Sequence, residues 1–197
     1  MKQTKLNIVT KTEKYPIIIG SNLTSNVSKI FKLNSINFNK CIIVIDKNVP
    51  KKFISNIKTS LKNKKIYLFF LKASEKNKNF NSVNKILEIL LKENFSRNDC
   101  LISLGGGITG DISGFVASLF KRGLRFVNIP TTLLARVDSS IGGKTGVNSK
   151  YGKNLIGSFY QPDLVISDVK FLKTLPKREL ICGYGEILKH SLILDRK

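Results

Sequence analysis

The sequence predicts an α/β fold, with a Rossmann-like, mainly parallel sheet and flanking helices, because apolar segments of strand length alternate with amphipathic segments of helix length. Between residues 83 and 91 the apolar positions recur at helical spacing, and Pro50 suits the first turn of a helix that extends to about Leu61. The segments of strand length are 15–19, 41–45, 65–71, 100–104 and 126–129. Such an alternation implies parallel strands joined by helices that cover both faces of the sheet.

Size and composition agree with a folded, soluble protein. The 197 residues suit one ordinary domain, and 42% of them are hydrophobic, so a buried core is expected. The first residues lack the apolar centre of a secretion signal, and segments such as 66–71 are too short to span a bilayer. Cys41, Cys100 and Cys182 form no C-x-x-C pair, and we expect buried, reduced thiols, a cytoplasmic location and no membrane contact.

The net charge of +21 raises the question of nucleic-acid binding. The excess comes mostly from Lys residues scattered among Asn and Ile. The chain lacks both the pattern of Arg forks that reads bases and the interleaved aromatic residues that stack on single strands. We therefore expect no nucleic-acid partner, although an anionic substrate would benefit from the positive field.

A glycine-rich loop after the predicted strand 100–104 carries the main functional signal. Gly105, Gly107 and Gly110 have the G-x-G-x-x-G spacing, after a strand and before a predicted helix. Glycines let the backbone approach a pyrophosphate, and the helix N-terminus behind them offers N–H groups and the positive end of its dipole. The loop predicts dinucleotide binding, although by itself the pattern also fits an ordinary glycine turn.

Two further patterns bear on the nucleotide. Dinucleotide sites usually have an acidic ribose reader about 20 residues after the glycines, and none lies at 126–130. Asp46 instead ends the earlier strand 41–45, where it either reads the adenosine from the other side of a switch point or simply belongs to a turn. The segment 142–145 looks like the end of a P-loop, but Asp138 occupies the place of the required first glycine, which makes an ATPase a poor interpretation.

A series of unusual strings covers the second half of the chain, at 105–114, 121–126, 130–146, 152–162, 171–176 and 186–189. Together they closely resemble 3-dehydroquinate synthase, and the match is looser over 1–100. The resemblance implies an NAD-dependent carbon–oxygen lyase of the shikimate pathway of aromatic amino acid biosynthesis. Such an enzyme converts 3-deoxy-D-arabino-heptulosonate 7-phosphate into 3-dehydroquinate and phosphate, and NAD is recycled as a catalyst.

The resemblance also implies roles for single residues. Arg122 matches an arginine that reaches the substrate phosphate of a neighbouring subunit, which implies a homodimer of full-length chains, and Glu186 matches one ligand of Zn²⁺, or of Co²⁺ in its place. The other positions around the substrate match Asp138, Lys144, Asn154 and Lys189. The positions that hold NAD match Asp46, Asn48, Glu75, Lys78, Gly106, Gly107, Ile108, Thr109, Gly110, Asp111, Thr131, Thr132, Leu134, Lys144, Lys153, Phe171, Leu172, Lys173 and Thr174.

These roles predict an arrangement in space. Lys144, Asn154 and Glu186 are expected to face the same cleft as the glycine loop. Glu186 and Lys189 stand three residues apart, on one face of a predicted helix. His190, the single histidine, would point about 100° around that helix from Lys189, and we do not assign it to the metal.

The last predicted helix bears on whether the chain is active by itself. The helix predicted over 176–194 runs to 195–197 without a capping glycine. We therefore expect an NAD-binding α/β domain over 1–175 and, over 176–197, the first helix of an all-α metal and substrate domain that is otherwise missing. Such a chain would bind NAD weakly or not at all and have no turnover. A related sugar-phosphate cyclase and a noncatalytic NAD-binding remnant stay as alternatives.

Three residues depart from the usual pattern of the resembled family. Ser74 and Ser191 replace common glycines, and Arg136 replaces a residue that is usually uncharged. Arg136 adds a charge two residues before Asp138, and its effect on that carboxylate is left open by the sequence.

Overall fold

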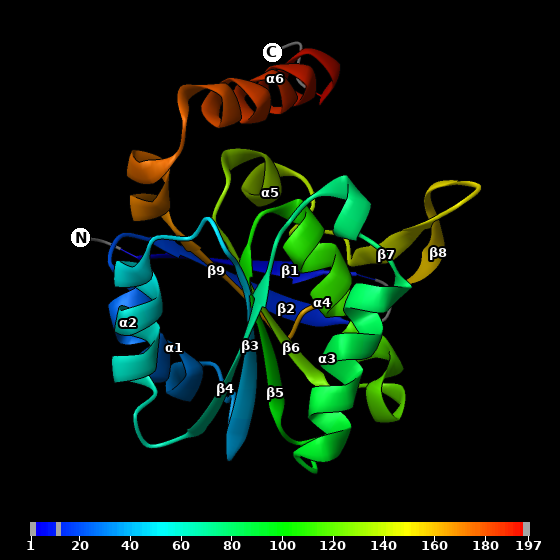
Figure 1. The fold of residues 1–197 in the computed structure, drawn as a ribbon. Coiled ribbons are helices and arrows are strands. Elements are labelled where there is room, and N and C mark those ends of the chain that lie inside the picture. The colour runs from blue at the N-terminus through cyan, green and yellow to red at the C-terminus, as the bar shows by residue number, and fades with distance from the viewer. Residues whose placement is uncertain (1–2, 11–12, 195–197) are drawn as a thin grey trace.

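A seven-stranded sheet runs through the middle of the structure, a computed structural model that describes residues 3–10 and 13–194 (Figure 1). The strands lie in the order β1-β2-β9-β6-β5-β3-β4. Neighbours from β2 to β4 pair in parallel, and β1 pairs antiparallel with β2 at one edge. This confirms the predicted parallel sheet. The bounds of its strands are β1 (Thr4–Val9), β2 (Lys14–Gly20), β3 (Lys40–Asp46), β4 (Lys65–Leu71), β5 (Cys100–Gly105), β6 (Arg125–Pro130) and β9 (Leu164–Asp168).

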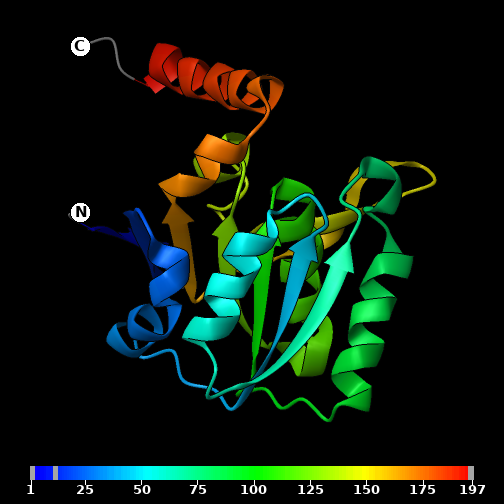
Figure 2. The ribbon, with the colours of Figure 1, turned by 60° about the vertical axis from the view of Figure 1, so that its left-hand side comes forward.

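Helices cover both faces of the sheet because its central strands are apolar on both sides (Figure 1 and Figure 2). In β3, Cys41, Ile43 and Ile45 belong to the core under α1 and α2, whereas Ile42 and Val44 belong to the core under α3 and α4. Successive residues of a strand point to opposite faces, so a continuous apolar strand supplies both layers. These helices are α1 (Val27–Leu33), α2 (Lys51–Ser60), α3 (Phe80–Lys92) and α4 (Gly107–Leu119).

The predicted segments correspond to β2, β3, β4, β5, β6, α2 and α3, but the hairpin of β7 (Lys144–Ser149) and β8 (Gly152–Phe159) was not predicted. Its strands approach closely at two glycines. A Cβ on Gly146 would lie 2.5 Å from the carbonyl oxygen of Ile156, and a Cβ on Gly157 would lie 2.0 Å from that of Thr145. Glycine normally weakens a strand, so the sequence of each strand by itself is typical of a loop. The close approach of the two backbones explains why glycine is present.

The remaining elements are short, except for the last helix. They are the 3-10 helices η1 (Leu23–Asn26), η2 (Glu75–Asn77), η3 (Phe120–Arg122) and η4 (Val169–Thr174), and the helices α5 (Leu133–Val137) and α6 (Lys177–Leu194). Helix α6 lies beyond the carboxyl ends of the parallel strands (Figure 1). No helix of the described residues is long and apolar enough to cross a membrane. Residues 1–2 and 11–12 of the predicted domain 1–175, and residues 195–197 of the predicted segment 176–197, lie outside the described residues.

The cysteines follow the prediction in part. Cys41 and Cys100 are buried and unpaired, and they stand opposite each other on the neighbouring strands β3 and β5. Cys182 is exposed, so the prediction that it is buried is wrong. It lies on the solvent-facing side of α6, a helix whose apolar residues do not all pack against the body of the chain.

Candidate functional site

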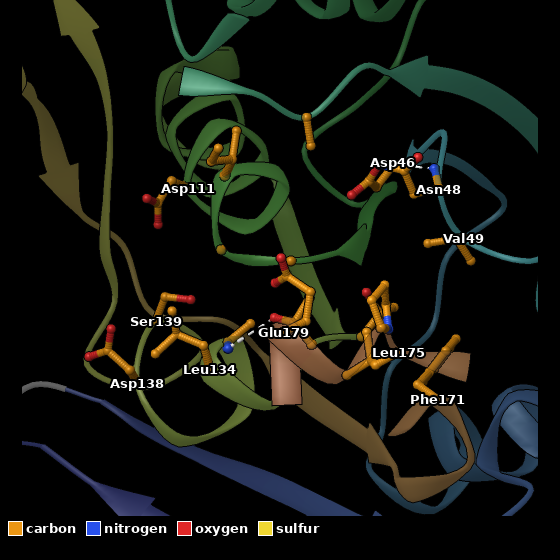
Figure 3. Close-up of a pocket in the computed structure, with 18 of the residues that line it drawn as sticks. Asp46, Asn48, Val49, Asp111, Leu134, Asp138, Ser139, Phe171, Leu175 and Glu179 are labelled. Carbon is orange, nitrogen blue, oxygen red and sulfur yellow. Dashed lines mark hydrogen bonds between the residues drawn. The ribbon is translucent and has the colours of Figure 1, made fainter. Parts of the chain in front are cut away.

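The carboxyl ends of the parallel strands meet at a cavity of about 770 Å³ (Figure 3). Strands β3 and β5 are neighbours, yet the chain leaves β3 toward β4 on one side and returns through β5 toward β6 on the other. Ligands of open α/β sheets bind at such a switch point. Asp46 ends β3 and Gly105 ends β5, and a Cβ on Gly105 would lie 3.0 Å from the Cβ of Asp46. The acid and the glycine loop therefore meet at the switch point, and because the N–H of Asn48 also donates to Asp46 within the turn, both interpretations of Asp46 stay predictions.

The glycine loop brings backbone N–H groups to the cavity. Gly106 and Gly107 line it, and no side chain caps the N-terminus of α4 that follows. A Cβ on Gly105 would lie 2.5 Å from Oγ1 of the buried Thr109, so glycine is needed where the strand turns into the helix. N–H groups at a helix N-terminus are a ready site for anionic oxygen atoms. The loop can thus hold a phosphate group without a lysine or arginine.

One end of the cavity combines Asp46 with apolar side chains. Burial raises the pKa of Asp46, although the N–H of Asn48 donates to its carboxylate at 3.0 Å and acts in the opposite direction. Phe171 lines the cavity beside Leu175 and packs on Phe53, with ring centroids 4.1 Å apart. The arrangement suits a flat base on the apolar wall and a hydroxyl donor at the carboxylate.

The opposite end is built on a buried lysine. Lys78 is 5% exposed, and its Nζ donates at 2.5 Å both to Oδ2 of Asp111 and to Oδ1 of Asn154. Burial raises the pKa of Asp111, and the Lys78 ammonium acts in the opposite direction. Asn148 extends the network, because its N–H donates to the carbonyl of Lys78 and its Nδ2 to the carboxylate of Glu75. These bonds tie the η2 segment, α4 and the hairpin together.

The two threonines before α5 join this helix to the glycine loop. The N–H of Thr131 donates to the carbonyl of Gly105 at 2.9 Å, and the side chain of Thr132 caps α5 by accepting from the N–H of Ala135 at 3.1 Å. Helix α5 and the residues after it then form another wall of the cavity, which includes Leu134 and Asp138 (Figure 3).

Arg136 contacts Asp168 instead of competing for Asp138. Its guanidinium donates to the carbonyl of Asp168 and lies 6.0 Å from the ring centroid of Phe171. Burial lowers the pKa of Arg136 to about 10, and the charge of Asp168 acts in the opposite direction. The side chain points to Asp168 because a partly buried guanidinium needs a hydrogen-bond acceptor, which the carbonyl of Asp168 provides.

The other two departures have simple structural consequences. Ser74 has extended backbone angles, with φ of −156°, so the position does not require glycine. The Ser191 hydroxyl donates to the carbonyl of Leu188 at 2.8 Å, within its own helix.

Helix α6 carries the predicted metal ligand. The Glu186 side chain is 17% exposed, its Oε1 accepts from Nζ of Lys189, and Nε2 of His190 lies 3.2 Å away. The hydrogen bond from Lys189 lowers the pKa of Glu186. The predicted proximity of Glu186 and Lys189 is confirmed. The contact with His190 was not predicted, although its spacing of four residues from Glu186 is a helical signal.

The donor set around Glu186 is incomplete for a metal. Among the described residues, no group of three or more His, Cys, Asp or Glu side chains could hold a metal ion. A catalytic zinc normally has three protein ligands. The described part of the chain therefore offers Glu186 as a single candidate ligand.

Most of the residues assigned to NAD line the cavity together. Thr109 is buried within α4 behind the loop, and Gly110 lies against Asn128, while Leu172 and Lys173 belong to η4 without lining the cavity. The assigned residues in the lining are Asp46, Asn48, Glu75, Lys78, Gly106, Gly107, Ile108, Asp111, Thr131, Thr132, Leu134, Phe171 and Thr174, together with Asp138 from the substrate set.

Several other predicted residues lie outside the lining. Asn154 contacts it through Lys78, and Nζ of Lys153 lies 3.8 Å from the carboxylate of Glu75. Lys144 is exposed at the start of β7. Arg122 is exposed just beyond the far end of α4. Lys144, Lys189 and Glu186 are not among the lining residues, so the structure does not bring Lys144 and Glu186 into one cavity with the glycine loop, and their roles stay predictions.

Sequence reasoning missed part of the lining. Glu179 is the one charged residue among the described lining residues that were missed. It stands four residues before Gly183 and seven before Glu186 on the predicted helix, a spacing that places all three on one face of that helix. The missed lining residues are Val49, Pro50, Ala73, Ala135, Ser139, Leu175, Pro176 and Glu179.

The family follows from a match over the central part of the chain. Residues 68–182 match the model of the family described as 3-dehydroquinate synthase N-terminal, which covers more than half of the chain. The chain belongs to the 3-dehydroquinate synthase family. The 3-dehydroquinate synthases of Pelagibacter ubique and Alkaliphilus metalliredigens are 65% and 44% identical to it, over 98% and 97% of the chain. The chain spans about half the length of these relatives, 52% in each case.

Solved structures of similar fold include two other cyclases. A 2-deoxy-scyllo-inosose synthase, solved with carbaglucose-6-phosphate, NAD⁺ and Co²⁺, superposes with a TM-score of 0.91 at 27% identity, over 98% of this chain and 53% of its own. A 2-epi-5-epi-valiolone synthase from Streptomyces hygroscopicus, solved with NAD⁺ and Zn²⁺, has a TM-score of 0.81 at 30% identity, over 92% of this chain and 50% of its own. Both likenesses agree with the fold of the 3-dehydroquinate synthase family.

Proposed function

We propose that the chain is the nucleotide-binding part of a 3-dehydroquinate synthase, the lyase that releases phosphate from 3-deoxy-D-arabino-heptulosonate 7-phosphate and forms 3-dehydroquinate. The observation that carries the proposal is the cavity in which the glycine loop lies between Asp46 and the Lys78–Asp111 pair. The identity of 65% to the Pelagibacter ubique protein, against 27% and 30% to the two cyclases, favours this reaction over that of a related sugar-phosphate cyclase. A noncatalytic NAD-binding remnant stays the alternative, because the chain spans 52% of that relative.

NAD is the cofactor that we propose for the cavity, and its residues fit the molecule. The glycine loop offers uncapped N–H groups for the pyrophosphate, and the wall with Phe171 beside Asp46 suits the adenosine. Asp46 accepts a ribose hydroxyl, and Lys78 holds Asp111 and Asn154 in place at the other end. Bound NAD supplies hydride acceptance and return. The protein's own part is to bind, orient and desolvate the reacting end.

A sugar phosphate with a carboxylate is the substrate that we propose, held by Asp138, Lys144, Asn154, Lys189 and Arg122. The attraction between fixed cations and such an anion becomes stronger as water is excluded from the site. Arg122 follows the 13-residue helix α4, whose length of about 20 Å separates it from the glycine loop. That distance favours a role in the site of a partner chain and thus supports the proposed homodimer.

Glu186 is the residue that we propose as a ligand of Zn²⁺ or Co²⁺. Its carboxylate is partly buried and faces two further polar side chains, Lys189 and His190. The described residues supply one of the three ligands that a catalytic zinc needs. The chemistry proposed for this chain is therefore limited to binding the nucleotide and part of the substrate.

We propose that α6 belongs to a second, helical domain, so that 1–175 form the NAD domain and 176–197 begin the next one. Ile181, Tyr184 and Leu188 follow helical spacing and are 60%, 67% and 53% exposed. Contiguous exposed apolar residues mark surfaces that another part of a protein covers. The buried, unpaired Cys41 and Cys100 support the proposed cytoplasmic location, where thiols stay reduced.

Titration with NAD⁺ tests the nucleotide proposal, with ligand-observed NMR because we expect weak binding. A Cβ on Gly106 would lie 3.2 Å from the side chain of Thr132 and crowd the phosphate position. The Gly106→Ala variant should weaken binding by about tenfold, about 1.4 kcal/mol. Gly185→Ala is the matched control, because a Cβ there meets nothing within 4 Å. A wild-type chain without any NAD⁺ binding would contradict the proposal.

Phosphate release tests the activity of the chain by itself. With NAD⁺, zinc and the seven-carbon sugar phosphate, we expect no turnover, since the described residues carry one metal ligand. Steady turnover that Glu186→Gln abolishes would show this expectation to be wrong while supporting the proposed reaction.

A further inference from the structure

The cavity is acidic although the chain carries a net charge of +21. Of the described residues that line it, five are carboxylates and one is a cation, Lys78. Lys78 contacts Asp111 at 2.5 Å and so serves one end of the cavity. At the other end, Asp46 and Glu179 share the lining with uncharged residues. The charge of the nucleotide end therefore depends on these two carboxylates.

Glu179 reaches the cavity because of how α6 packs. Gly183 contacts α5 so closely that a Cβ would lie 2.6 Å from the Cβ of Leu133 and 2.7 Å from the backbone nitrogen of Leu134. Residues four apart share one face of a helix, so Glu179 lies on the same side of α6, one turn earlier. Figure 3 shows its side chain projecting from α6 into the cavity.

Asp46 and Glu179 are close enough to influence each other. Burial is the largest cause that raises the pKa of Asp46, and the negative charge of Glu179 raises it further. Two carboxylates without a cation are unfavourable unless hydrogen-bond donors reach them. Among the described residues, Asn48 donates one N–H to Asp46 at 3.0 Å, whereas Val49, Phe171 and Leu175 in the lining provide no donor from their side chains. The pair calls for a ligand that brings its own hydroxyl groups.

We propose that Glu179 is a specificity-determining residue that, together with Asp46, selects NAD over NADP. The inference rests on the proposed NAD function of this cavity. The free hydroxyls of the adenosine ribose donate to the two carboxylates, whereas a 2′-phosphate brings further negative charge to the same place. Sites that accept the 2′-phosphate place an arginine there, and none of the described residues that line this end of the cavity is a lysine or an arginine.

The test compares the dissociation constants of NAD⁺ and NADP⁺ for the wild-type chain and for Glu179→Gln, by ligand-observed NMR. We expect the wild type to prefer NAD⁺ and the Glu179→Gln variant to reduce that preference by about tenfold, with the change mostly in NADP⁺ affinity. Glu179→Lys, which reverses the charge, should reduce it further. Glu88→Gln removes the same charge from an exposed position of α3 outside the cavity and should leave the preference unchanged.

The outcomes separate this inference from the function on which it rests. A wild-type chain that binds neither dinucleotide overturns both. If the wild-type chain binds NAD⁺ but its preference over NADP⁺ is the same in Glu179→Gln and Glu179→Lys, the role of Glu179 alone is overturned. Amide spectra of the variants report whether α6 keeps its position, and an equal loss of both ligands with a displaced helix would identify a merely structural role.

Discussion

The two ends of the cavity handle their carboxylates in different ways. At one end, the buried Lys78 neutralises Asp111 and also holds Asn154, so the network is closed within the protein. At the other end, Asp46 and Glu179 have no cation beside them in the described lining. A closed network positions the residues that it contains, whereas Asp46, which accepts one N–H of Asn48, and Glu179 keep carboxylate oxygens that can accept from a ligand. The difference agrees with our proposal that the second end selects the nucleotide, whereas the first end is held together by protein groups.

The comparison predicts the largest loss of unfolding free energy for removal of Lys78. Lys78→Met leaves the largely buried Asp111 without its cation, so the variant should lose about 3 kcal/mol of unfolding free energy near neutral pH. The pKa of Asp111 in the folded state, already raised by burial, should rise further. A carboxyl with a raised folded-state pKa stabilises the fold below its unfolded pKa and loses that contribution as pH rises through the folded pKa. Urea unfolding should therefore show a smaller loss near pH 4, about the ordinary pKa of Asp.

Lys76→Met is the control for this prediction, because Lys76 is exposed and lies outside the cavity lining. Its unfolding free energy should stay within about 0.5 kcal/mol of the wild type. Equal stability of the Lys78 and Lys76 variants would show that the closed network contributes nothing.

A smaller effect is expected from moving the helix that carries Glu179. Gly183→Ala places a Cβ 2.6 Å from Leu133, so α6 must shift away from α5. Relative to Gly185→Ala, the variant should lose about 1–3 kcal/mol of unfolding free energy. Its preference for NAD⁺ over NADP⁺ should fall toward that of Glu179→Gln, measured by the same titrations. An unchanged preference would mean that the position of α6 does not control the nucleotide end.

The smallest expected effect is a change in the pKa of Asp46 at the nucleotide end of the cavity. The side-chain carboxyl carbon of Asp46, followed by NMR as a function of pH, should titrate above the ordinary Asp value of about 3.9. In Glu179→Gln the midpoint should move down, because a neighbouring negative charge has been removed. In Glu88→Gln it should stay in place. If the titration midpoint of Asp46 is the same in the wild type and in Glu179→Gln, the two carboxylates are too far apart to act together.

The parts of the molecule that could be predicted share a local signal. Strands such as 41–45 are apolar throughout because both faces are buried, and the glycine loop carries its spacing within a few residues. The hairpin of β7 and β8 has no such signal, since Gly146 and Gly157 make sense only against the opposing backbone. The sequence places Arg136 two residues from Asp138, but the partner of Arg136, Asp168, lies 32 residues away along the chain. Separation along the chain hides such pairs.

The sequence by itself determined the layered α/β fold, the glycine loop and, through its motifs, the family, because hydrophobic periodicity and backbone freedom are properties of neighbouring residues. Only the tertiary structure decided that Asp46 lies beside that loop, that Lys78 is buried against Asp111, and that Glu179 reaches the cavity from α6. The physical reason is that charge and burial in a cavity depend on which segments meet there, and chain order does not specify the distance between two distant side chains.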